Sequence, residues 1–197
     1  MFSQLGLVRL GSALCGFILT TAALELVERR SPQASAQSRD EKAIADFQKR
    51  MDGYVALHKK IETALPKLPD RATAEQIDTN QREFGRLLIQ ARGSAKQGDL
   101  FGAEMEALVR RALAPLFKGP QGASLKAAIS EEPHPVIPAV NVRYPDDVPL
   151  STMPPAVLRA LPPLSESIEY RFIGRHLILL DPHAHLIADV IPNAMPA

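Results

Sequence analysis

The chain has 197 residues, of which 46% are hydrophobic and 23% are charged, with a formal net charge of +1. This composition suffices for one domain with a packed core and excludes a chain that is disordered throughout. The balanced charge excludes a strongly basic nucleic-acid-binding surface, and the low aromatic content (5%, no Trp) excludes a surface that binds ligands mainly by ring stacking.

Residues 1–36 have the three zones of a secretory signal peptide. Arg9 supplies a positive charge, Leu10–Leu24 is an uncharged and mostly apolar run of 15 residues, and Ala34-Ser35-Ala36 matches a small-x-small cleavage site. The run is shorter than the ~20 residues that span a bilayer. We therefore expect export to the periplasm or beyond with removal of the signal peptide. A long polar stretch follows the run, so cleavage near Ala23 and an uncleaved membrane anchor stay open as alternatives.

Cys15 is the single cysteine and lies inside the apolar run. The expected mature chain therefore has no disulfide, no cysteine nucleophile and no thiolate metal ligand. Its charge is uneven, with 16 Lys/Arg against 12 Asp/Glu in residues 37–129 and 4 against 8 in residues 130–197. This difference can draw the two parts together, and it is too small to indicate a nucleic acid as partner.

Two long helices are predicted first. Apolar residues recur every three or four positions over Asp40–Leu65, which predicts a helix with one apolar stripe. Thr73-Ala-Glu-Gln76 is a capping box, because the Thr hydroxyl and the Gln amide can each bond a free backbone N–H. It predicts a second helix that runs to about Ala95, with its apolar stripe at Ile77, Phe84, Leu87, Leu88 and Ala91.

Two further helices complete the region. Asp99 is the expected N-cap of a third long helix that ends near Pro115, and Ser124–Ser130 is a short fourth helix. We interpret Gly119–Gly122 as a turn between them, because it lacks the lysine and the preceding strand of a phosphate-binding loop. The short connections predict antiparallel neighbours.

Residues 131–197 contain 12 of the 17 prolines and end in strand-like runs. Pro154–Leu161 predicts a brief helix that begins at proline. Gly174-Arg175 suits a type II′ hairpin turn. Leu177–Leu180 is apolar on both faces, so its strand should be central and covered on both sides by the helices. The predicted strands are Ile168–Ile173, His176–Asp181 and Leu186–Ile191, with Val140–Tyr144 as a candidate fourth.

These elements predict an α+β fold. N-terminal antiparallel helices, three long and one short, pack on a C-terminal antiparallel meander of three or four strands. After the signal peptide of residues 1–36, we expect the helical region 37–130 and the proline-rich segment with its β-meander, 131–197, to form one domain.

The end of the chain carries a resemblance. Tyr170–Asp181 (YRFIGRHLILLD), followed by the apolar run Leu186–Ile191, resembles the C-terminal hairpins of small exported bacterial proteins, including periplasmic proteins of the nickel/cobalt-homeostasis type. The similar stretch covers about 22 of the 197 residues. The resemblance implies export and assigns no functional residue.

Metal binding is one functional hypothesis. His183 and His185 are two residues apart and would point to the same side of an extended backbone, with Asp181 and Asp189 close by in the meander. Two imidazoles and a carboxylate can bind Zn, Ni or Cu. The alternative is that these histidines, like His134 and His176, are turn or strand-end residues that face water.

Hydrolysis is a second hypothesis. The candidate carboxylate pairs for acid–base catalysis are Asp146/Asp147, Glu131/Glu132 and Asp181/Asp189. A Ser–His–Asp triad could also be assembled from Ser165, His176 and Asp181. Neighbouring carboxylates in a strand point to opposite faces, however, and the sequence has no G-x-S-x-G, S-x-x-K or H-E-x-x-H motif. We therefore expect a protein that is not an enzyme and needs no cofactor.

His58 lies on the apolar stripe of the first helix. It is either a ligand or pH-sensitive group, or a partly buried histidine that bonds a neighbour. We interpret four helix arginines as parts of a solvent-exposed surface with ion pairs: Arg82, Arg86, Arg110 and Arg111.

The preferred functional prediction is an exported envelope protein that acts through contact with another envelope protein, since the wide apolar stripes and the proline-rich segment offer contact surfaces. A periplasmic metal-binding protein is the alternative, and an unrecognised hydrolase is the third. No nucleic-acid partner is expected, and the membrane is involved only through an uncleaved signal; the sequence leaves the oligomeric state open.

Overall fold

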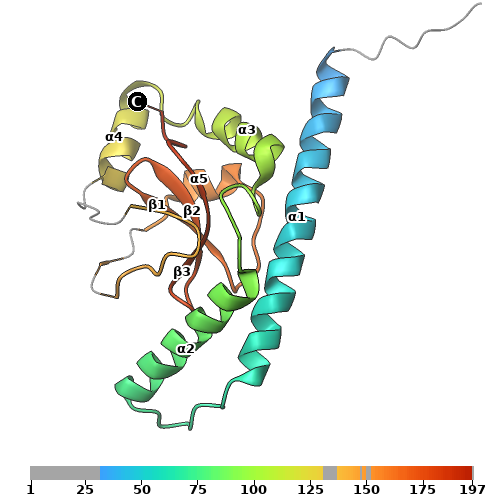
Figure 1. The fold of residues 1–197 in the computed structure, drawn as a ribbon. Helices are drawn as coiled ribbons and strands as arrows, with labels where there is room; N and C mark the ends of the chain where they lie inside the picture. Colours follow the sequence, from blue (N-terminus) through green and yellow to red (C-terminus); the bar gives the residue numbers. More distant parts are fainter. Residues whose placement is uncertain (1–31, 131–136, 147, 150–151, 197) are drawn as a thin grey trace, which may run out of the picture.

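Helices form the N-terminal part of the protein and a β-meander the C-terminal part (Figure 1). The structure, a computed structural model, describes residues 32–130, 137–146, 148–149 and 152–196. The α+β prediction is confirmed. No helix within these residues is long and apolar enough to cross a membrane. The elements are α1 (Pro32–Ala64), α2 (Ala74–Arg92), α3 (Gly102–Leu113), α4 (Gly119–Ser130), α5 (Pro155–Ala160), β1 (Glu169–Ile173), β2 (His176–Asp181) and β3 (Leu186–Ile191).

The first helix begins earlier than its apolar stripe predicted. α1 starts at Pro32 rather than Asp40, so the expected cleavage site, Ala34–Ala36, lies within its first turns. Proline is favoured at a helix start because it has no N–H to satisfy there. Most of the predicted signal peptide, residues 1–31, lies outside the described residues.

The capping box of α2 is confirmed. Thr73 Oγ1 accepts from the Gln76 backbone N–H, and Gln76 Oε1 accepts from the Thr73 N–H. The helix ends at Arg92 instead of Ala95, because Gly93 has a positive φ of 49° and its N–H closes the last turn on Ile89. The predicted stripe is partly wrong: Phe84 and Leu88 are buried, whereas Ile77 and Ala91 are exposed.

Two predicted features of α3 and α4 are wrong. Asp99 does not cap α3; its carboxylate accepts from the Lys96 N–H in the preceding turn, and α3 begins at Gly102. Gly119–Gly122 is the first turn of α4 rather than a loop. A Cβ on Gly122 would stand 2.2 Å from the backbone carbon of Phe117, so close packing requires this glycine.

The sheet has the order β1-β2-β3 and is antiparallel throughout. Gly174 has φ 56°, as the first position of a II′ turn requires. The register of β2 on β3 shifts between Leu179 and Leu180. The candidate fourth strand, 140–144, only forms an isolated bridge between Arg143 and Leu186, so the described sheet has three strands.

Strand β2 is central and buried on both faces, as predicted. Side chains of α1, α3 and α5 pack with Leu177 and Leu179 on one face. The expectation that helices also cover the other face is wrong: there Ile178 and Leu180 pack against Val140, Tyr144 and Val148. Backbone bonds anchor this segment to β3, from Asn141 N to Ile187 O (2.9 Å), and to the turn before it, from Tyr144 N to His185 O (2.7 Å).

Candidate metal centre

A buried carboxylate joins α1 to the end of β2. Asp181 is fully buried, and its Oδ2 accepts from Tyr54 Oη at 2.9 Å and lies 2.7 Å from His58 Nδ1. Tyr54 and His58 are four residues apart and therefore share one face of α1. Burial, and then the Asp181 charge, raise the pKa of Tyr54 far above its usual range, so Tyr54 remains a hydrogen-bond donor.

The same carboxylate shapes the turn after β2. Asp181 Oδ1 accepts from the Ala184 backbone N–H at 3.0 Å, which fixes the turn that carries His183. The His183 ring stacks on Phe84 of α2 with centroids 4.5 Å apart, and its centroid lies 5.7 Å from that of His58. Asp181 thus orients two histidines that are far apart in the sequence.

Glu62 completes a three-residue group. It lies one turn after His58 on α1, and its Oε1 is 3.7 Å from His183 Nδ1. One ligand atom each from His58, Glu62 and His183 lies within 4.8 Å of the other two. Two imidazoles and a carboxylate are a common ligand set for zinc, with room for one further ligand.

The orientation of His58 suits metal binding. Its Nδ1 faces the Asp181 carboxylate, so Nε2 is the nitrogen left for an ion. Metal-binding histidines commonly donate their other N–H to a carboxylate, which fixes the tautomer and increases the basicity of the ligating nitrogen. With an ion on Nε2, Asp181 would hold the His58 ring from behind and would not itself be a ligand.

The four residues predicted as metal ligands do not come together. His183 belongs to the group above, and Asp181 supports it from behind. His185 has a positive φ of 46° and lies instead beside Asp146, with Nδ1 2.8 Å from Oδ1. That Asp146 also pairs with Arg82 and Arg143 on the surface.

Asp189 has a structural role. It is fully buried and accepts from the backbone N–H groups of Gly98 (2.9 Å), Leu100 (2.8 Å) and Phe101 (2.9 Å). These bonds hold the turn that leads into α3. The sequence predicted Asp99 as the side chain that accepts from the backbone before α3, but the acceptor is Asp189 of β3.

Arg92 is the counter-charge of the buried carboxylates. Its guanidinium lies 5.3 Å from the ring centroid of Tyr54 and donates to Asn141 Oδ1 and to Ala188 O, both at 2.7 Å. Burial lowers its pKa, while Tyr54 and then the Asp189 carboxylate oppose this shift. Arg92 thus supplies one positive charge near the two buried carboxylates, Asp181 and Asp189.

The hydrolytic triad is not assembled. His176 and Asp181 are the first and last residues of β2, roughly 17 Å apart at ~3.4 Å per residue. His176 Nδ1 accepts from the Asn193 N–H at 3.4 Å, and burial, followed by the nearby Arg175, lowers the pKa of His176. Glu131, Glu132, His134 and Asp147 lie outside the described residues.

A groove opens beside His183. It has a volume of about 570 Å³ and is bounded by the end of α1, the α1–α2 connection and α2. Two members of the three-residue group, Glu62 and His183, line this groove. Its lining residues are Glu62, Thr63, Leu65, Pro66, Lys67, Leu68, Asn80 and His183.

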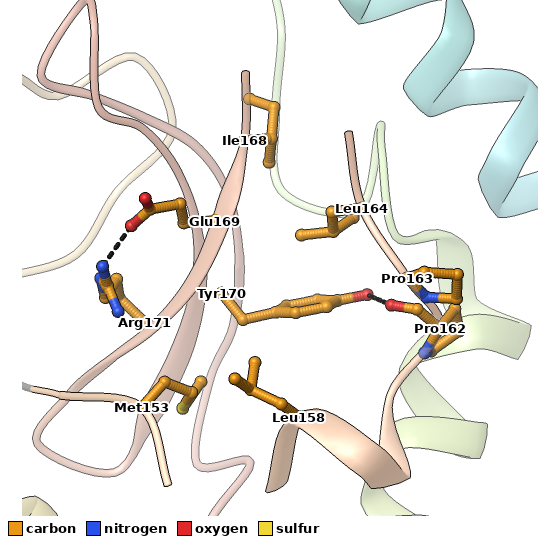
Figure 2. Close-up of a pocket in the computed structure, with 9 residues that line it drawn as sticks. All are labelled: Met153, Leu158, Pro162, Pro163, Leu164, Ile168, Glu169, Tyr170 and Arg171. Carbon is orange, nitrogen blue, oxygen red and sulfur yellow. Dashed lines mark hydrogen bonds and ion pairs between the residues drawn. The ribbon is translucent and has the colours of Figure 1, made fainter. Parts of the chain in front are cut away.

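A second hollow lies between β1 and α5, with a volume of about 380 Å³ (Figure 2). The ring of Tyr170 points toward Pro162 and donates to its carbonyl at 3.1 Å. Burial raises the pKa of Tyr170 far above its usual range. Glu169 and Arg171 pair with each other (Figure 2). The hollow therefore offers an apolar wall and a neutralised ion pair, which suits packing more than chemistry.

Glu62 is the residue that sequence reasoning missed. A signal was present, because His58 and Glu62 are four apart on one helix and so lie side by side. The third member, His183, is over 100 positions away and no local pattern links it to them.

Comparison with protein-family models, curated proteins and solved structures finds no match to this chain. The resemblance of the C-terminal hairpin to nickel/cobalt-homeostasis proteins stays an expectation.

Proposed function

We propose that the protein binds one divalent transition-metal ion of the zinc, nickel or copper type through His58, Glu62 and His183. The observation that carries the proposal is the 2.7 Å contact of His58 Nδ1 with the buried Asp181 carboxylate, on the far side of the ring from the nitrogen available to an ion. Imidazole and carboxylate ligands favour these ions over magnesium or calcium.

The predicted export of the chain fits this proposal. Its one cysteine, Cys15, lies in the expected signal peptide, so metal binding in the mature chain uses no thiolate, in line with the imidazole and carboxylate ligands proposed above. Such ligands are not oxidised to disulfides in a periplasm or outside a cell. A site with such ligands is therefore compatible with the export that the sequence predicts.

Native mass spectrometry of the full chain after incubation with zinc tests the proposal, with and without a chelator. We expect one chelator-sensitive zinc ion per chain. His183→Ala should remove it, and the matched variant His185→Ala, two residues away in the same turn, should retain it. Equal zinc uptake by the two variants would refute the assignment.

Contact with an envelope protein is a second proposal. A groove of about 460 Å³ runs between the α1–α2 connection and α2, and Leu68 beside it is 40% exposed. Ile77 and Ile89 are also exposed on α2, although neither lines this groove. Exposed apolar side chains around a groove are typical of surfaces that bind another protein.

Crosslinking in intact cell envelopes tests this second proposal. Leu68→Asp should abolish a crosslinked species that Leu158→Asp preserves, because Leu158 is equally exposed but lies on α5. A crosslinked species that survives both substitutions would contradict a contact at the α1–α2 connection.

A further inference from the structure

The three proposed ligands differ strongly in exposure. The side chain of His58 is only 4% exposed, whereas those of His183 and Glu62 are 37% and 52% exposed. An ion held by all three therefore has Asp181 and Phe84 behind it, on the His58 side. Any further coordination position faces the groove of about 570 Å³ that Glu62 and His183 line.

The charges around this groove favour an anion. A divalent ion bound by two neutral imidazoles and one carboxylate keeps a net charge of about +1. Lys67 adds a second positive charge, and Glu62, which the ion would bind, is the one carboxylate among the lining residues of this groove. Glu75 and Glu83 line the adjoining groove of about 460 Å³, where Glu83 pairs with Arg86. The loaded groove is thus electropositive.

The backbone beside Lys67 is held in place by α2. The backbone carbonyl of the preceding residue, Pro66, accepts from Asn80 Nδ2 of α2 at 3.3 Å. This bond ties the α1–α2 connection to α2 at the residue before Lys67. Leu65 and Leu68 flank it and give the groove an apolar wall.

We propose that the metal-loaded groove binds a small molecule through an oxyanion group, a carboxylate or a phosphate, with one oxygen on the ion and another near the Lys67 ammonium. The volume of about 570 Å³ exceeds that of the oxyanion itself and leaves space for a short apolar body against Leu65 and Leu68. This inference rests on the proposed metal site and adds its ligand class.

Cobalt(II) is a suitable probe because its visible spectrum reports the number and type of its ligands. The full chain is loaded with one equivalent of cobalt and titrated separately with propionate and with inorganic phosphate. We expect a saturable spectral change with at least one of them. A change with propionate alone assigns a carboxylate ligand, and a change with phosphate alone assigns a phosphate ligand.

Lys67→Met should weaken anion binding by roughly 1.5-fold to fivefold, the usual effect of one exposed charge, and leave cobalt affinity unchanged. Lys60→Met is the matched control, since Lys60 is exposed on α1 but does not line the groove. It should leave both affinities unchanged.

Two negative results have different meanings. If cobalt binds to the three ligands but neither anion changes its spectrum, or if Lys60→Met weakens the anion as much as Lys67→Met, the ligand inference is overturned and the metal site stands. If the chain binds no cobalt, zinc, nickel or copper, the proposed function itself fails.

Discussion

Removal of the Asp181 carboxylate should destabilise the protein more than removal of any surface carboxylate. Asp181 accepts hydrogen bonds from Tyr54, His58 and the Ala184 N–H. In Asp181→Ala these three donors lose their acceptor in a buried place, at about 1–3 kcal/mol each, and relief from burying a charge offsets part of this cost. We expect a net loss of about 3–5 kcal/mol of unfolding free energy.

Urea denaturation followed by circular dichroism measures this loss, and the melting temperature should fall by on the order of 10 °C. Asp181→Asn keeps the shape and one acceptor oxygen, so it should lose about half as much. Asp146→Ala is the control: its side chain is 41% exposed and its ion pairs contribute less than about 1 kcal/mol. If Asp181→Ala loses no more stability than Asp146→Ala, the buried network does not stabilise the fold as described.

Three further predictions concern stability. Asp189→Ala should lose about 3 kcal/mol in urea denaturation, because the turn 98–101 loses the acceptor of three backbone N–H groups; a loss below about 1 kcal/mol would contradict its role. Gly85→Ala should lower the unfolding free energy by about 1–2 kcal/mol, because the added Cβ would lie 3.0 Å from Ala184 O. Gly53→Ala, whose Cβ would have nothing within 4 Å, should raise the unfolding free energy by about 0.5–1 kcal/mol. Equal effects of the two substitutions would refute the close approach of Gly85 to Ala184. Free zinc at 100 times its dissociation constant should stabilise the protein by about 2.7 kcal/mol in thermal unfolding, and a shift that a chelator does not reverse would speak against a bound ion.

Local patterns predicted the elements whose interactions are local. The capping box at Thr73 and Gln76 closes within three residues, and the turn at Gly174 connects adjacent strands, so both could be recognised in the sequence. The apolar run of β2 predicted a central strand because burial on both faces needs apolar residues at every position.

Contacts that the local patterns do not show decided two features that the sequence did not reveal. Asp99 resembled an N-cap, but the backbone N–H groups before α3 bond Asp189, about 90 positions away. Gly122 resembled a turn residue, although it is a glycine because the Phe117 backbone lies against it.

In the candidate site, too, some features had a local sequence signal and others depend on the fold. The sequence singled out His58 and His183 separately, and the i, i+4 spacing of His58 and Glu62 was available as a local signal. Only the fold brings α1 beside the turn after β2, and only the fold turns His185 toward Asp146. A positive φ at His185 breaks the extended geometry that the His183/His185 spacing had assumed.

An anomalous difference map from crystals grown with zinc, recorded at the zinc absorption edge, would show whether His58, Glu62 and His183 hold an ion together. We expect one dominant peak about 2.0–2.2 Å from a nitrogen of His58, a nitrogen of His183 and an oxygen of Glu62. A dominant peak between His185 and Asp146, or no peak beside His58, would contradict this expectation.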